Sequence, residues 1–102
     1  MAGVRDYLKQ RYERGKAGYQ QDELSYILGN WSSYACQVIG VTSYQGKKVI
    51  VLNFFPKRDI NDWAADWKTN EVAVKGGGAG YFRVEYDPEQ KAFGVMWANA
   101  PA

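Results

Sequence analysis

The chain has 102 residues, of which 46% are hydrophobic and 24% charged, and its formal net charge is only +2. This length suits one domain with a single core, and the composition is that of a soluble globular protein. No stretch approaches the roughly 18 apolar residues that a membrane-spanning helix needs. We therefore expect a single domain over residues 1–102, with no transmembrane segment.

The absence of histidine restricts the chemistry most. The sequence holds no histidine and one cysteine, Cys36. Without an imidazole, the Ser-His-Asp and Cys-His mechanisms lose their general base, and zinc sites lose most of their usual ligands. Cys36 lies in an apolar run with no neighbouring Lys or Arg, which is typical of a buried, unreactive thiol. We expect no metal and no cofactor, and a non-enzymatic role is favoured over catalysis.

The N-terminal segment combines positive charge with a helical pattern. Its apolar residues recur at helical spacing and predict an amphipathic helix over residues 3–14, which ends at Gly15 and Gly18. Five basic residues lie within the first twenty: Arg5, Lys9, Arg11, Arg14 and Lys16. They form either a solvated helix face or a contact with an acidic surface. Charges also interrupt the apolar run that a signal peptide needs, which favours the cytoplasm; a signal removed earlier would leave no trace.

A second helix and a β-hairpin follow. Asp22 is expected to cap the helix, which carries Leu24 and Ile27 on its apolar side and ends at Gly29. Strands are predicted over residues 33–44 and 47–55, joined by a short turn. Residues 49–55 are apolar on both faces, so we expect a central strand covered on both sides, by the N-terminal helix and by a partner or the next helix.

The second half reads as a short helix followed by a meander. Pro56 ends the central strand, and Asp59 is expected to cap a helix over residues 60–68. Strands are predicted over 71–75, 81–87 and 91–98, with a glycine loop at 76–80 and a turn at 87–90. Helices first and antiparallel hairpins later define an α+β fold with a four- to five-stranded sheet.

Three motifs favour structural over functional interpretations. The glycine run at 76–80 lacks the Gly-Lys-Ser/Thr ending and the following helix of a phosphate loop, so it is interpreted as a loop. Residues 79–86 match an RNA-binding strand at some positions but lack a base-stacking aromatic, which argues against nucleic acid. Asp59, Asp62 and Asp66 are interpreted as the solvated face of the short helix.

The tryptophans carry the functional hypotheses. Trp63 and Trp67 share one stripe of the short helix with Ile60 and Ala64. They either pack onto the sheet or form a groove for a partner, since tryptophan is enriched at binding hot spots. Polar tips of a small-molecule pocket are expected from the strand that follows, at Tyr81, Arg83 and Glu85.

The order of elements is similar to the cystatin-like architecture, in which an antiparallel sheet wraps around a helix. Protease-inhibiting cystatins carry a Gln-x-Val-x-Gly loop, whereas residues 37–40 read Gln-Val-Ile-Gly and no Pro-Trp loop is present, so inhibition is not implied. Residues 76–98, with the Tyr86-Asp87-Pro88 turn, also resemble the C-terminal hairpin of small uncharacterised bacterial proteins, including some on mobile gene cassettes. That likeness implies no activity.

Two functions are therefore expected as alternatives. The first is a non-enzymatic binding module that engages a protein partner, or itself as a dimer, through exposed aromatics around Trp63 and Trp67 or through an uncovered sheet face. The second is a small-molecule-binding protein or enzyme, with an aromatic pocket between helix and sheet that includes Tyr81, Arg83 and Glu85.

Overall fold

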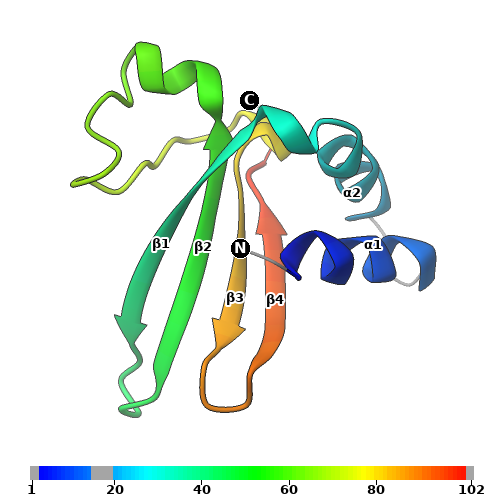
Figure 1. Ribbon diagram of the computed structural model, residues 1–102, viewed down its shortest axis with the longest axis vertical. Coiled ribbons are helices and arrows are strands. Elements are labelled where there is room, and N and C mark those ends of the chain that lie inside the picture. Colours follow the sequence, from blue (N-terminus) through cyan, green and yellow to red (C-terminus); the bar gives the residue numbers. More distant parts are fainter. Residues whose placement is uncertain (1–2, 15–19, 101–102) are drawn as a thin grey trace.

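A computed structural model describes residues 3–14 and 20–100. Two α-helices, α1 (Val4–Arg14) and α2 (Gln20–Gly29), pack beside a four-stranded antiparallel sheet (Figure 1). The strands are β1 (Tyr34–Thr42), β2 (Lys48–Pro56), β3 (Phe82–Asp87) and β4 (Ala92–Ala98), and neighbours in sequence are neighbours in the sheet. The α+β class and the antiparallel meander are confirmed. The expected helix stops at Gly15 and Gly18, and the basic residue Lys16, lie outside the described residues.

One face of the sheet, here called the helix-covered face, carries the main core. Val4 and Leu8 of α1 and Leu24 and Ile27 of α2 are fully buried. They pack against alternate strand residues, which point to the same side because side chains alternate along a strand. These strand residues are Leu52, Phe54, Phe82, Val84 and Met96. The apolar spacing of both helices thus matches the face that they bury.

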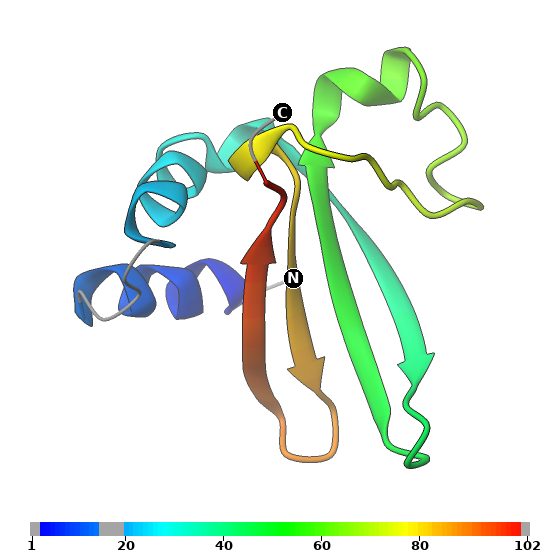
Figure 2. The ribbon, with the colours of Figure 1, turned by 180° about the vertical axis from the view of Figure 1, so that it is seen from behind.

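A smaller core lies on the opposite face, here called the helix-free face. Phe55 points to this side at the end of β2 and is fully buried. It is covered by an arm, residues 57–75, which leaves the sheet after Pro56 and returns across it (Figures 1 and 2). Ala64 and Val72 of the arm are buried against Phe55, and Trp67 packs on its ring. The central strand is therefore covered on both sides at this end, as its apolar pattern predicts.

The arm is less regular than expected. In place of a helix over 60–68, it has a short 3-10 helix, η2 (Lys57–Asn61), followed by turns through residue 69. Asp59 does not cap this helix; it lies inside η2 and is buried. The expected solvated face is therefore wrong at Asp59, whereas Asp62 and Asp66 are exposed.

Residues 71–75 form no strand. They run extended over the helix-free face, but β2 already pairs with β1 and β3, and β3 with β2 and β4, so neither strand has a free edge. Side-chain hydrogen bonds to the backbone of this segment take the place of the backbone hydrogen bonds that a strand would form. The Val72 N–H donates to Gln37 Oε1, and its carbonyl accepts from Asn53 Nδ2, while Asn99 Nδ2 donates to the Val74 carbonyl.

The glycine run connects the arm to β3 through a 3-10 turn, η3 (Gly78–Gly80). Gly77 has a φ of +82°, and a Cβ atom there would lie 2.6 Å from the Tyr81 ring. Glycine is therefore required here by both backbone and space. Among the described residues, no helix is long and apolar enough to cross a membrane.

Candidate functional site

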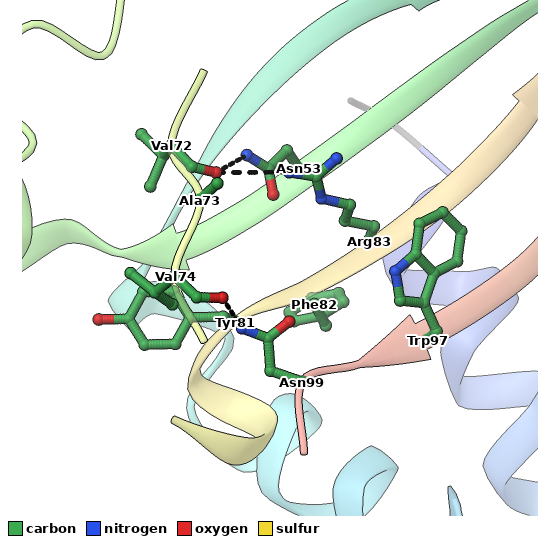
Figure 3. A pocket seen from close by; sticks show the side chains of 9 residues that line it. All are labelled: Asn53, Val72, Ala73, Val74, Tyr81, Phe82, Arg83, Trp97 and Asn99. Atoms are coloured by element: carbon green, nitrogen blue, oxygen red, sulfur yellow. Dashed lines mark hydrogen bonds between the residues drawn. The ribbon is translucent and has the colours of Figure 1, made fainter. Parts of the chain in front are cut away.

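The helix-free face has a hollow at its upper end, where β2 ends at Pro56 and the arm begins. An uncovered apolar strip lies at its lower end, toward the β1–β2 and β3–β4 turns. The hollow lies between the arm and strands β3 and β4 and encloses about 230 Å³. Figure 3 shows it lined by Asn53, Val72, Ala73, Val74, Tyr81, Phe82, Arg83, Trp97 and Asn99. Its floor is one row of the sheet, in which Asn53 pairs with Arg83 and Arg83 with Trp97.

Asn53 is the buried polar group of the hollow. Its side chain is 4% exposed, and Nδ2 donates to the Val72 carbonyl at 2.8 Å and to Gln37 Oε1 at 3.1 Å. A carbonyl can only accept, so the amide nitrogen must face Val72 and the amide oxygen must face away. That oxygen, Oδ1, receives no hydrogen bond from any described residue, and Figure 3 shows it pointing into the hollow.

Arg83 supplies the positive charge. Its Nη2 lies 2.8 Å from Glu71 Oε2 and 3.4 Å from the Val72 carbonyl, and its side chain is about a quarter exposed. Within residues 3–14 and 20–100, no acceptor takes the N–H groups on Nε and Nη1. The ion pair with exposed Glu71 is screened by solvent and contributes little stability. The guanidinium thus keeps donors that a ligand can use.

Trp97 closes the row at the edge of the sheet. It is the cross-strand neighbour of Arg83, and 36% of it is exposed. No described residue accepts a hydrogen bond from its indole N–H. An exposed indole beside a guanidinium offers a flat apolar surface next to a positive charge.

The expected site residues are only partly brought together. Tyr81 and Arg83 line the hollow, whereas Glu85 lies further down the same face, beside a second hollow of about 200 Å³ near the β3–β4 turn. Trp63 and Trp67 are separated. Trp67 packs on Phe55 with ring centroids 5.8 Å apart, while Trp63 is 45% exposed on the arm.

Tyr81 links the arm to the hollow. Its hydroxyl donates to Asp59 Oδ2 at 2.6 Å, and its ring centroid lies 6.5 Å from that of Trp63. Burial, followed by the hydrogen bond to Asp59, raises the pKa of Tyr81 to about 12. The hydroxyl therefore stays protonated near neutral pH. It donates a hydrogen bond to the buried carboxylate of Asp59 and does not act as a base.

The lower half of the helix-free face is uncovered and carries apolar side chains on both sides of Glu85, which lies on β3. Val41 and Val95 are 45% and 59% exposed, and Ile39 on β1 and Val49 on β2 are half-buried beside Val41. Together with Trp97 they form the apolar strip. No described element lies over it, because the arm covers only the upper end of β1 and β2 (Figure 2). At its lower border Lys47 and Asp87 form a 2.9 Å ion pair, whose hydrogen bond lowers the pKa of Asp87 and raises that of Lys47.

Reactive groups are few. Burial raises the pKa of the Cys36 thiol, which makes the thiolate scarce at neutral pH. The part of the chain that the structure describes has no cluster of three His, Cys, Asp or Glu residues that could hold a metal ion. The hollow therefore offers hydrogen bonding, charge and an aromatic surface.

Asn53, Trp97 and Asn99 were not predicted as site residues. Asn53 carries a signal that sequence reasoning could have used, because it is the one polar residue within the apolar run 49–55. A buried amide in a central strand needs partners, and those partners define the hollow.

Comparison of the chain with models of protein families, with curated proteins and with solved structures gives no match.

Proposed function

We propose that this protein is a non-enzymatic interaction module that binds a second copy of itself through the apolar strip. The observation that carries the proposal is the exposure of Val41, Val95 and Trp97 on one face of the sheet. Single exposed apolar residues are ordinary, but several on one uncovered sheet face are typical of an interaction surface. On this face Arg83 and Glu85 of β3 separate the apolar residues of β1 and β2 from those of β4. The aromatic pair expected from the sequence, Trp63 and Trp67, offers no such surface because Trp67 packs inward on Phe55.

The exposed area supports association. The chain of 11.6 kDa exposes 6646 Å², whereas a compact monomer of this mass exposes about 5800 Å². The excess of roughly 800 Å² is close to the area that each partner buries in a standard-size interface. This excess is spread over the whole chain, and the exposed residues of the strip contribute part of it.

A second copy also suits the chemistry of the strip. Most of its members are valine, isoleucine or tryptophan, and the charges at its lower border, Lys47 and Asp87, neutralise one another. Two such surfaces, each with equal numbers of positive and negative groups, can face each other across a two-fold axis without net charge repulsion. Arg83 and Glu85, which lie on β3 of this face, also carry opposite charges, so the face as a whole favours neither a strongly basic nor a strongly acidic macromolecule.

Sedimentation velocity over a range of concentrations tests this proposal with two matched variants. Val95 and Val38 are 59% and 61% exposed, and both lie on edge strands, but Val38 points to the helix-covered side of β1. We expect the native chain and Val38→Glu to form dimers and Val95→Glu to remain monomeric. A monomeric native chain at high concentration, or equal loss of dimer in both variants, would contradict the proposal.

A further inference from the structure

We propose that the upper hollow binds a small flat molecule that carries both an anionic group and an N–H donor. The site goes beyond self-association, because Asn53 and Arg83 lie outside the apolar strip and under the arm, although Trp97 belongs to both. Three groups that line the hollow and are available to a ligand indicate its chemistry. They are the amide oxygen of Asn53, the guanidinium of Arg83 and the indole of Trp97.

Asn53 specifies the donor. Its side chain is more than nine-tenths buried, and its amide nitrogen is fully engaged with Val72 and Gln37. Its oxygen faces the hollow with no described donor. The oxygen itself is not fully buried, so it is open to the hollow and available to accept a hydrogen bond. A ligand N–H can donate to this oxygen, and a ligand group that only accepts hydrogen bonds cannot.

Arg83 specifies the charge. The guanidinium stands in the same row as Asn53, and its N–H groups on Nε and Nη1 have no acceptor among the described residues. Glu71 holds only Nη2 and is itself exposed. A carboxylate on the ligand can therefore approach Arg83 without breaking a buried pair, and charge-assisted hydrogen bonds are the stronger kind.

Trp97 and the size of the hollow specify the shape. The indole is partly exposed on the far side of Arg83, so a flat ring can lie against it while its substituents reach Arg83 and Asn53. The volume of about 230 Å³ falls below the ~300 Å³ at which pockets for drug-sized ligands begin. The hollow thus fits a single small ring with one carboxylate.

Pyrrole-2-carboxylate is a suitable probe, because it joins a flat ring, an N–H donor and a carboxylate. Two analogues each remove one feature: furan-2-carboxylate lacks the N–H, and pyrrole-2-carboxamide lacks the charge. Varying the probe avoids mutating Asn53, which also holds the arm in place. Binding is followed by ¹H–¹⁵N NMR at the indole N–H of Trp97, which is assigned by its loss in Trp97→Phe.

We expect saturable shifts at Trp97 and Arg83 with pyrrole-2-carboxylate, and about tenfold weaker binding of each analogue. In Arg83→Gln the carboxylate should lose its advantage over the carboxamide, whereas Arg58→Gln, an exposed site on η2, should bind as the native chain does. Pyrrole-2-carboxylate should still bind to Val95→Glu, the variant expected to be monomeric. This result would show that the hollow binds its ligand independently of the proposed dimer. Equal binding of all three probes, shifts outside the hollow, or no saturable shift at millimolar concentrations would overturn the inference.

Discussion

Replacing Asn53 with alanine tests whether side-chain hydrogen bonds hold the arm on the sheet. The substitution removes two hydrogen bonds, to the Val72 carbonyl and to Gln37 Oε1. Neither acceptor is left entirely unpaired, because Val72 keeps a 3.4 Å contact with Arg83, and Gln37 Oε1 keeps the Val72 N–H at 2.9 Å. The substitution should therefore lower the free energy of unfolding by the net contribution of two hydrogen bonds. At about 1 kcal/mol each, the loss is about 2 kcal/mol.

Urea denaturation measures this loss. With a slope of about 1–2 kcal/mol/M for a domain of this size, the midpoint should fall by roughly 1–2 M. Hydrogen exchange adds a local measurement, because the Val72 amide is protected only while the arm is docked. It should exchange faster in Asn53→Ala.

Asn61→Ala is the matched control. Asn61 is exposed on η2, and its side chain forms no hydrogen bond with the described residues, so this change should stay within about 0.5 kcal/mol of the native chain. A loss below about 0.5 kcal/mol in Asn53→Ala as well, with unchanged exchange at Val72, would refute the reasoning. The apolar contacts of Val72 and Ala64 would then suffice to hold the arm.

Two further predictions concern the same region. The folded state holds the Tyr81 proton up to a pKa of about 12, above the ordinary value of 10.0, so its contribution to stability is present below about pH 10 and is lost as the pH rises toward 12. Urea unfolding at stepped pH should therefore show a shallower alkaline decline in Tyr81→Phe, and an identical decline would show that Tyr81 titrates normally. Gly77→Ala and Gly46→Ala both place alanine at positive φ, but only at residue 77 does the new Cβ meet another residue, the Tyr81 ring at 2.6 Å. Thermal unfolding should show a loss of about 1 kcal/mol for Gly46→Ala and a clearly larger one for Gly77→Ala; equal losses would remove the steric part of the explanation.

The strands and helices were predictable because their signals are local. Apolar spacing places α1 and α2, and the turn at Gln45-Gly46 fixes the β1–β2 hairpin, so the bounds of α1 and of the four strands differ from the expected ones by at most about two residues. The expected cap at Asp22 is wrong, because α2 begins at Gln20 and Asp22 lies in its first turn. The segment 71–75 has the same local signal as a strand. Whether this segment forms a strand depends on whether a neighbouring strand has a free edge, and that is a property of the whole sheet.

The candidate site was less accessible to sequence reasoning. Tyr81 and Arg83 were expected to line a pocket, and both line the hollow, but it lies on the helix-free face and not between helix and sheet. The pairing of Arg83 with Trp97 depends on a register shift in β3–β4, where Val84 pairs with Met96 but Tyr86 with Phe93. Trp63 points outward because the arm follows turns after η2, where a continuous helix would have kept Trp63 and Trp67 on one stripe.

The central claim, that the helix-free face is where this protein associates, is tested most directly by methyl NMR of its valines during dilution. Val41, Val49 and Val95 lie on the helix-free face, and Val38, about as exposed as Val95, lies on the opposite face. The account predicts that the methyl resonances of Val41, Val49 and Val95 shift together as the concentration rises, while those of Val38 stay in place. Concentration-dependent shifts at Val38 without shifts at the other three would contradict it.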